Sequence, residues 1–288
     1  MKKRVKENGF LAFMRKYVKH RVAFVATIAL LLEILLVIIL PPIMQLDPIT
    51  SDFAHMAEAP SSLHILGTDK TGRDVFARLI CGGRVSLVVG IGATIVSLII
   101  GVPLGVLAGY YQGWVGNLIM RIVDMFLSFP SMVITLVLIA VLGPSTWTVV
   151  FVTGFLSWMQ HCKLLYGSVA GVRNKEYVEA AIAIGTGDFK ILTKYVIPNS
   201  ISPLWVSIAF TVSTSIVFES SLSFLGAGVQ PPESSWGNII YAAQSLSTMT
   251  DTPWIWLPAG LVLLFTVICI NLVGEGIRDA LDPKMKRK

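Results

Sequence analysis

EYVEAAIAIGTGDFKILTKYVIP, residues 176–198, is a Lys-bearing polar stretch set between long hydrophobic runs. Its first part carries helix-forming residues up to Gly185, and a second apolar-polar run follows the Thr186-Gly187 turn. The stretch therefore predicts two short helices joined by a turn, inside a larger polar segment that spans residues 163–203.

The helix boundaries in this stretch follow from its capping residues. Asn174 is expected to cap a first helix over Lys175–Ile184. Gly185 is expected to end that helix, because glycine accepts the left-handed conformation that helix ends commonly need. Asp188 is expected to cap a second helix from Phe189, and Pro198 to end it.

The composition around this segment is that of an integral membrane protein. Hydrophobic residues make up 54% of the 288 positions, charged residues only 14%, and the mean hydropathy is +0.73. A membrane-crossing helix needs roughly 20 apolar residues. The sequence predicts an all-α polytopic membrane protein with six transmembrane helices, at about 22–40, 86–110, 125–142, 147–166, 204–225 and 254–273.

The first run, Val22–Leu40, follows a basic N-terminus and is interrupted only by Glu33 before Pro41-Pro42. No small-residue cleavage pattern follows, so a retained anchor helix is expected. Residues 1–21 carry hydrophobic side chains at helical spacing and predict an elbow in the headgroup region beside the bundle, with a helical extension of the first span as the alternative.

The positions of Lys and Arg predict the topology. Eight precede the first run, five lie in 163–203 and five in the basic tail 278–288, whereas none lies between Lys194 and Arg278. Basic loops stay in the cytoplasm, so both termini and 163–203 are expected inside, and loops 41–84 and 227–253 outside. The net charge of +6 fits a membrane surface better than nucleic acid.

Glycines and prolines inside the runs predict local packing. Gly101, Gly105 and Gly109 repeat a small-xxx-small spacing that lets another helix approach closely, with a flexible hinge as the alternative. Pro103 and Pro130 each remove a backbone donor and are expected to kink their spans.

Several motifs resemble one transporter family. Glu179-Ala180-Ala181-x3-Gly185, with Pro198 thirteen positions later, is similar to the EAA signature of binding-protein-dependent permeases of bacterial ATP-binding-cassette importers. His64–Asp69 with Gly72–Leu79, Glu219–Gly226 with Ser235-Trp236-Gly237, and Leu281-Asp282-Pro283 resemble the C-type subunit of the dipeptide, oligopeptide and nickel permeases.

The resemblance implies one half of a path for peptides across the bacterial cytoplasmic membrane. The implied partners are a second homologous permease subunit, two ATPases that use ATP and Mg, and an extracytoplasmic binding protein. The residues that it implies for ATPase coupling are Glu176, Glu179, Ala180, Ala181, Gly185, Asp188 and Pro198. A nickel-chelate importer is the alternative cargo, and an ion-coupled secondary transporter or a non-transporting scaffold are the alternative functions.

Polar residues inside the runs are candidates for the translocation path, because intramembrane acids are costly. Glu219, Ser220, Ser223 and Ser213 form this candidate set, with helix-to-helix contact as the alternative role. Glu33 is expected to bond to another helix, and Arg121 to pair with Asp124.

The chain itself is not expected to catalyse a reaction or to bind a cofactor or metal. Gly67-x4-Gly72 continues with Arg73-Asp74 where a phosphate loop needs Lys and Ser or Thr. Three cysteines are isolated, His161-Cys162 has no second ligand pair, and the other three histidines are scattered singly, as fits polar surface or loop roles.

Overall fold

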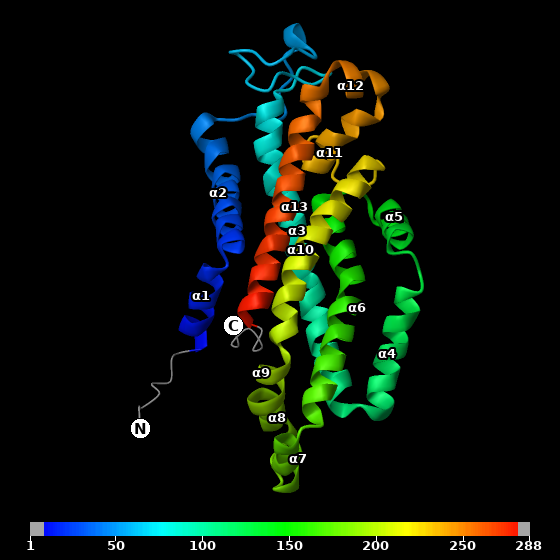
Figure 1. Ribbon diagram of the computed structural model, residues 1–288. Coiled ribbons are helices and arrows are strands. Elements are labelled where there is room, and N and C mark those ends of the chain that lie inside the picture. The colour runs from blue at the N-terminus through cyan, green and yellow to red at the C-terminus, as the bar shows by residue number, and fades with distance from the viewer. Residues whose placement is uncertain (1–8, 282–288) are drawn as a thin grey trace.

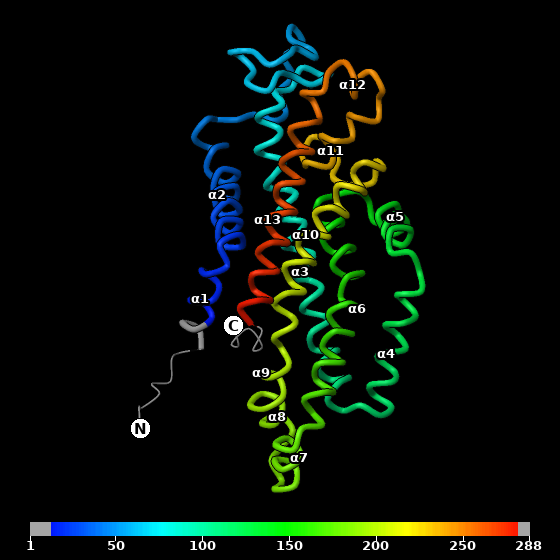
Figure 2. Tube along the Cα trace, in the orientation of Figure 1, coloured from blue at the N-terminus to red at the C-terminus, as the bar shows by residue number. Residues whose placement is uncertain are grey.

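A computed structural model describes residues 9–281, which form an elongated bundle of helices (Figure 1). The tube in Figure 2 shows that the chain runs up and down the long axis of the bundle. The helical elements are α1 (Gly9–Lys19), α2 (Arg21–Met44), η1 (Phe53–His55), α3 (Val75–Tyr111), α4 (Gly113–Leu127), α5 (Ser131–Leu142), α6 (Thr146–Arg173), α7 (Glu176–Ala183), α8 (Asp188–Ile191), η2 (Leu192–Val196), α9 (Ile197–Ser200), α10 (Ser202–Phe224), α11 (Trp236–Ile240), η3 (Tyr241–Gln244), α12 (Leu246–Asp251), η4 (Pro253–Ile255) and α13 (Leu257–Leu281).

The all-α membrane fold predicted from the sequence is confirmed. Within residues 9–281, the helices α2, α3, α10 and α13 are each long and apolar enough to cross a membrane, and α4 with α5 makes a fifth span if the bent pair counts as one. The predicted run 147–166 lies in α6, which is 28 residues long. The count of six spans stays a prediction, as does the side on which the termini lie.

Helices α3 and α6 pack backbone against backbone. Cβ atoms added to Gly101, Gly105 and Gly109 would lie 2.5, 2.6 and 2.8 Å from backbone oxygens of α6. Real Cβ atoms do not approach that closely, so only glycine permits this helix-to-helix distance. The packing role expected for the three glycines is confirmed. The helix α3 runs through Pro103 without ending.

Helix α2 continues past Pro41 and Pro42 to Met44, beyond the end that the sequence predicts. The two prolines lack the N–H groups that would bond to the carbonyls of Val37 and Ile38. Arg84 of α3 replaces them, because its Nε donates to the Val37 oxygen (2.8 Å) and its Nη2 to the Ile38 oxygen (2.6 Å). The predicted outer loop 41–84 is therefore too long at both ends: α2 extends to Met44 and α3 begins at Val75.

The predicted third span, 125–142, covers α5 and only the last three residues of α4, and the axes of α4 and α5 differ by 82°. The break falls at Ser128–Pro130. Phe129 precedes proline and is therefore disfavoured from the helical region, and Pro130 has no N–H to continue the ladder. The kink expected at Pro130 is thus confirmed, and it is large enough to separate two helices.

Helix α1 is a separate helix and not an extension of α2. His20 has φ −80° and ψ 80° between the two, and its Nδ1 accepts from the Ala23 N–H (3.2 Å). Tyr17 is buried against Ala23 and Ala280, and Lys16 donates to the Ala280 carbonyl (3.2 Å). The described part of the predicted elbow therefore lies beside the end of α13, and residues 1–8 and 282–288 are outside the described part.

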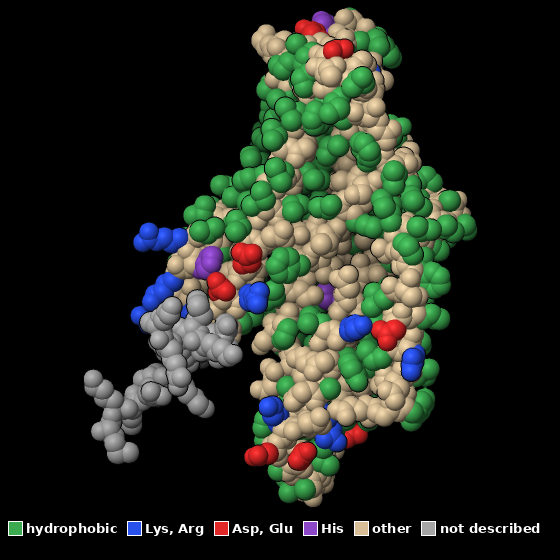
Figure 3. Space-filling view, turned by 45° about the vertical axis from the view of Figure 1, so that its right-hand side comes forward, with side chains coloured by type: hydrophobic (Ala, Val, Ile, Leu, Met, Phe, Trp, Pro, Cys, Tyr) green, Lys and Arg blue, Asp and Glu red, His purple; other side chains and the backbone are tan. Residues whose placement is uncertain are grey.

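The two ends of the bundle differ. Helices α7 and α8 protrude at the lower end in Figure 1, and the 45–74 loop and α12 lie at the upper end. In the space-filling view, most visible Lys and Arg side chains gather in the lower half, below a broad band of hydrophobic and uncharged groups (Figure 3). This separation of charge agrees with the loops that the sequence assigns to opposite sides.

Candidate functional site

The lower end is built by the stretch that carries the EAA resemblance. Helix α7 ends before Gly185, which has φ +75° as its predicted terminating role requires. The predicted caps are wrong. Helix α6 extends to Arg173 and makes Asn174 its own C-cap, so Lys175 precedes α7, and Gly187 rather than Asp188 precedes α8.

Pro198 does not end the second helix, contrary to the prediction. The chain passes from α8 through a π-helical turn, η2, into α9, where Pro198 occupies the first turn. A backbone N–H is dispensable in the first turn of a helix. The wider π turn accommodates the hydrogen bond that Pro198 cannot donate. Such turns are frequent at functional sites.

Asp188 connects the stretch to helix α3 instead of capping α8. Its carboxylate accepts hydrogen bonds from the Tyr110 hydroxyl (2.8 Å) and from the Tyr111 hydroxyl (3.5 Å) at the end of α3. The Arg173 guanidinium lies 5.6 Å from the centre of the Tyr110 ring. The short α8 is therefore held to a membrane-spanning helix by a charged hydrogen bond.

Helix α7 has one buried face and one exposed face. Val178 and Ala181 pack into the chain's own core with residues of α3, α6 and α10, so Ala181 is not available to a partner. Glu176, Glu179 and Ala180 are exposed. Ile184 and Phe189, which sequence reasoning passed over, are each 82% exposed on either side of Gly185. The sequence signal that could have identified them is a pair of large apolar residues flanking a turn.

A groove with polar groups follows α6 and α10 beside the α4–α5 break. One cavity of about 240 Å³ and a second of about 360 Å³ share Gln160, Thr211 and Thr214. The first also includes Phe129 and Ser131 from the break. Sequence reasoning missed these lining residues, although polar side chains at one-turn spacing on α10 were a readable signal.

The predicted path residue Glu219 is fully buried. Its Oε1 accepts from the hydroxyls of Ser223 (2.7 Å) and Ser235 (2.8 Å), and its Oε2 from those of Ser86 (3.4 Å) and Ser220 (3.5 Å). These serines come from α3, α10 and the residue before α11. In the described structure Glu219 therefore joins three elements and lines no groove.

Other intramembrane polar residues also join helices. Ser213 donates to the Asn271 Oδ1 of α13 (2.8 Å), and Thr266 of α13 donates to Glu33, which confirms the interhelical role expected for Glu33. Asp124 pairs with Lys163 of α6 (3.2 Å), so the expected Arg121–Asp124 pair is wrong. The ring nitrogens of His161 lie 3.1 Å from the Ser207 hydroxyl and 3.3 Å from the Thr211 hydroxyl.

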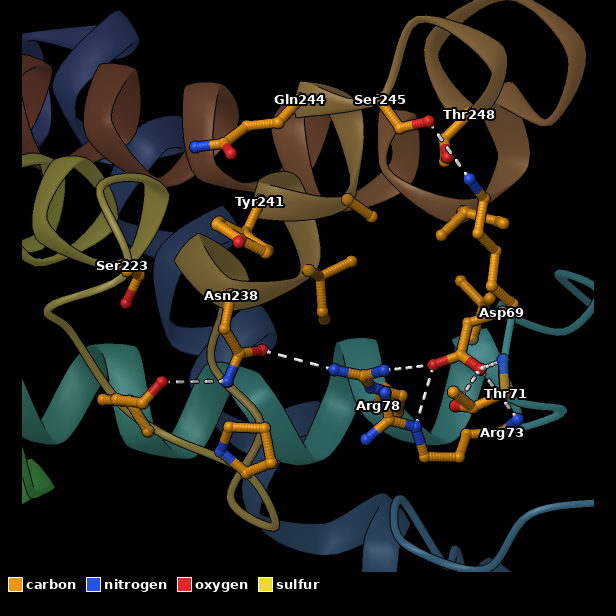
Figure 4. Close-up of a pocket in the computed structure, with 18 of the residues that line it drawn as sticks. Asp69, Thr71, Arg73, Arg78, Ser223, Asn238, Tyr241, Gln244, Ser245 and Thr248 are labelled. Atoms are coloured by element: carbon orange, nitrogen blue, oxygen red, sulfur yellow. Dashed lines mark hydrogen bonds and ion pairs between the residues drawn. The ribbon is translucent and has the colours of Figure 1, made fainter.

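A cavity of about 710 Å³ opens at the upper end (Figure 4). It lies between the start of α3, the end of α10 and the η3–α12 region, and Ser223 is among its lining residues. Arg78 is buried at one side, where it donates to Asp69, to Ser234 (3.2 Å) and to Asn238 (3.4 Å). Lys70 spans to Ser245 (3.2 Å).

Asp69 is the charged centre of that wall. Burial alone would raise the pKa of its carboxyl, but hydrogen bonds from Thr71 and the Arg73 N–H and the charges of Arg78 and Arg73 outweigh burial. The pKa of Asp69 is therefore held below its ordinary value. One carboxylate thus positions two guanidinium groups in the wall of the cavity.

Known proteins resemble the chain over most of its length. The family model described as "Binding-protein-dependent transport system inner membrane component" matches residues 101–287. The glutathione transport system permease protein GsiD of Pectobacterium atrosepticum is 36% identical over 275 residues, 95% of this chain and 91% of that protein. The oligopeptide transport system permease protein OppC of Bacillus subtilis is 34% identical over 275 residues, 95% and 89% of the two chains.

Solved structures agree with this assignment at the level of the fold. A chain of the MetNI methionine ABC transporter in an inward-facing conformation superposes with a TM-score of 0.59 at 17% identity, over 71% of this chain and 97% of that one. The resemblance predicted from the motifs is confirmed by the family match. The chain belongs to the family of binding-protein-dependent transport system inner membrane components, and it is a multi-pass protein of the inner membrane.

Proposed function

We propose that this chain is one of two permease halves of an ATP-driven importer of peptides. The related GsiD and OppC are named as glutathione and oligopeptide permeases, which supports a peptide cargo over the nickel-chelate alternative. A second, homologous permease subunit would complete the path, two ATPases would bind ATP and Mg, and a binding protein would deliver peptide at the outer end.

The observation that carries the proposal is the exposed lower tip and its attachment to α3. Exposed Glu176 and Glu179 offer negative charge to a basic surface of the partner. Ile184 and Phe189 expose apolar surface of the kind that marks a protein–protein contact. This tip seats in the ATPase. When ATP binding closes the two ATPases, the tip moves and Asp188 carries the movement to Tyr110.

The groove along α6 and α10 forms this chain's side of the path. Gln160, Thr211 and Thr214 supply hydrogen-bonding groups there, and Phe129 at the α4–α5 break supplies an apolar margin. A peptide backbone needs both kinds of contact. Glu219, Ser220 and Ser213, which the sequence proposes for the path, support it indirectly by fixing α10 against its neighbours.

Coupling is tested in proteoliposomes that contain the complete transporter. Glu179→Ala is expected to reduce ATP-dependent peptide uptake at least tenfold, while Glu275→Ala on the exposed face of α13 serves as the matched control. Uptake of a labelled tripeptide, a longer peptide and a nickel chelate separates the cargo classes. Uptake that needs an ion gradient but no ATP would overturn the proposal, as would normal uptake by Glu179→Ala.

The path is tested by cysteine labelling after Cys81, which is partly exposed, has been replaced by Ser. Thr214→Cys is expected to react with a water-soluble maleimide and to be protected by peptide cargo. Ile99→Cys, on a face of α3 that is 67% exposed at that residue, is the control and should show no cargo protection. Equal reactivity of Thr214→Cys with and without cargo would mean that the groove is not part of the path.

A further inference from the structure

The 45–74 loop brings together two histidines that stand nine positions apart in the sequence. One candidate donor atom from each of Asp52, His55 and His64 lies within 4.8 Å of the others. The rings of His55 and His64 are 5.9 Å apart, centre to centre. The sequence predicts no metal ligation by these histidines, because each stands singly and fits a polar loop role; the folded loop brings the two together.

His64 is oriented as a metal ligand would be. Its Nδ1 lies 2.8 Å from the Asp74 Oδ2, and Asp74 is itself fixed because its Oδ1 accepts from the Ala77 N–H (2.7 Å) at the start of α3. The other nitrogen, Nε2, is buried and has no hydrogen-bond partner. A carboxylate on one ring nitrogen that leaves the other free is the usual arrangement around metal-bound histidine.

A second unsatisfied atom lies on the opposite side of His55. The Glu58 Oε2 is buried without a hydrogen-bond partner and lies 3.9 Å from the His55 Nε2. The other ring nitrogen of His55 lies 2.8 Å from the Asp52 Oδ2. Two imidazoles are thus surrounded by the carboxylates of Asp52, Glu58 and Asp74, a donor set that carries net negative charge and suits a divalent cation.

The backbone around these side chains is held in place. The Asp52 N–H donates to the Gly72 carbonyl (2.9 Å), and the Ala57 N–H donates to the Asp69 carbonyl (2.9 Å). A Cβ on Gly72, whose φ is +78°, would lie 2.1 Å from the Asp52 carbonyl oxygen. The segment with Asp52 and His55 is therefore fastened to the segment that leads from His64 into α3, which pre-positions the ligands.

We propose that Asp52, His55 and His64 bind a zinc ion, with water in the fourth position. Zinc bonds of about 2.0–2.2 Å require the donors to close by roughly 1 Å. The side chains of His55 and Asp52 are 39% and 44% exposed and have room to rotate. The ion replaces the proton shared between His55 and Asp52, which passes to solvent, and new metal–nitrogen and metal–oxygen bonds form.

The site would fasten the outer loop to the start of α3. His64 and Asp74 adjoin α3, whereas Asp52 and His55 belong to η1 and the residue before it, so the ion would cross-link the two. This role is independent of the cargo: the site lies in the loop at the upper end, and its residues are not among those that line the groove along α6 and α10.

The test uses the full-length chain within its purified transporter complex, stripped of metal and dialysed against Zn²⁺. Zinc per complex, measured by mass spectrometry, is expected to fall by one per copy of this chain in His55→Gln and His64→Gln, with at least a tenfold loss of affinity. His20→Gln is the matched control, because His20 pairs with Asp279 of α13, outside the 45–74 loop. Zinc bound to other subunits is the same in the wild-type and variant complexes, so it does not affect the difference in zinc content between them.

A second measurement separates loss of ligation from loss of folding. Co²⁺ is expected to give a visible absorption band in the wild-type complex that His55→Gln lacks, and zinc is expected to raise the Tm of wild type but not of His55→Gln. His55→Gln alters a partly exposed residue at the end of η1 and should fold even if His64→Gln does not. Equal zinc content, Co²⁺ spectrum and Tm shift in wild type and His55→Gln would overturn the proposal.

Discussion

The Tyr110 hydroxyl donates a 2.8 Å hydrogen bond to the Asp188 carboxylate, and this bond joins the last turn of a 37-residue helix to the first residue of a four-residue one. The sequence contains both residues but gives no sign that they meet. Since α8 lies next to the exposed tip, the bond is the shorter of the two hydrogen bonds that Asp188 forms with α3.

Removing this bond should weaken coupling more than it weakens folding. Tyr110→Phe is expected to cost about 1 kcal/mol, because a hydrogen bond to a charged acceptor is lost at a solvated site, and to reduce peptide uptake per ATP hydrolysed about fivefold. Tyr111→Phe removes the longer 3.5 Å bond and is the matched control. Equal effects of the two variants on the uptake-to-hydrolysis ratio would show that the shorter bond has no special role.

Gly185 and Gly187 form a matched pair for testing the turn. Gly185 has φ +75° and Gly187 has φ −64°, and a Cβ added to either meets nothing within 4 Å. Gly185→Ala is expected to strain the turn by roughly 1–2 kcal/mol and to reduce uptake, whereas Gly187→Ala should transport normally. If both variants behave as wild type, the left-handed turn is not required for coupling.

The contact between α3 and α6 predicts a stability effect that depends on position. A Cβ at Gly105 would lie 2.6 Å from the Cys162 carbonyl oxygen, so Gly105→Ala is expected to destabilise the protein by about 1–3 kcal/mol. Gly167, within α6, has open space around it, and Gly167→Ala should be neutral or slightly stabilising. Thermal unfolding in detergent measures both, and a lower Tm for Gly167→Ala than for Gly105→Ala would contradict the packing argument.

Arg84 should be required for the end of α2. Arg84→Leu leaves the carbonyls of Val37 and Ile38 without donors, at an expected cost of about 1–3 kcal/mol. Arg84→Lys keeps the charge but not the two-pronged donor geometry, and it should restore only part of the loss. Protease cleavage near Pro42 and the Tm report the effect, and a Tm equal to wild type for Arg84→Leu would show that lipid or water satisfies the carbonyls.

Acid should weaken the wall of the upper cavity through Asp69. Because the pKa of Asp69 in the folded protein is below its ordinary value of 3.8, its stabilisation is complete above about pH 3.8 and is lost as the pH falls through the lower, folded value. Asp69→Asn is expected to lower the Tm at neutral pH by leaving Arg78 unpaired, at a cost of about 3 kcal/mol.

The pH series itself provides the check on Asp69. The gap in Tm between wild type and Asp69→Asn should be constant from pH 7 to pH 5 and shrink below about pH 3.8. A gap that shrinks already near neutral pH would assign the effect to another group. A gap that does not change at any pH would mean that the carboxylate charge contributes nothing.

Sequence patterns predicted the features that depend on local chemistry. Apolar runs located α2, α3, α10 and α13, Gly185 predicted the end of α7, and Pro130 predicted the break, because each feature acts within one or two turns of backbone. The end of α2 was predicted too early, at Pro41 and Pro42. The side chain that donates to the carbonyls left free by these prolines, Arg84, comes from a helix more than forty residues away in the chain.

The functional residues were harder to predict because they depend on which helix faces meet. Glu219 is an acid within a span, which suggested a path, yet hydroxyls from three elements converge on it and bury it. Ala181 matches the EAA signature but faces the core, and its neighbour Ala180 faces outward. Periodicity alone does not say which face of a short helix is covered.

The length of α3 has a consequence for communication across the membrane. Its 37 residues extend about 55 Å, from the Asp74 cap beside the upper cavity to Tyr110 beside α8, and its glycines lock it to α6 along the way. Such a strut transmits displacement in both directions. A ligand bound at the upper end should therefore change the free energy of local opening at the tip, measured by hydrogen exchange. Opening of the tip should change the binding free energy of that ligand by the same amount, since thermodynamic linkage is reciprocal.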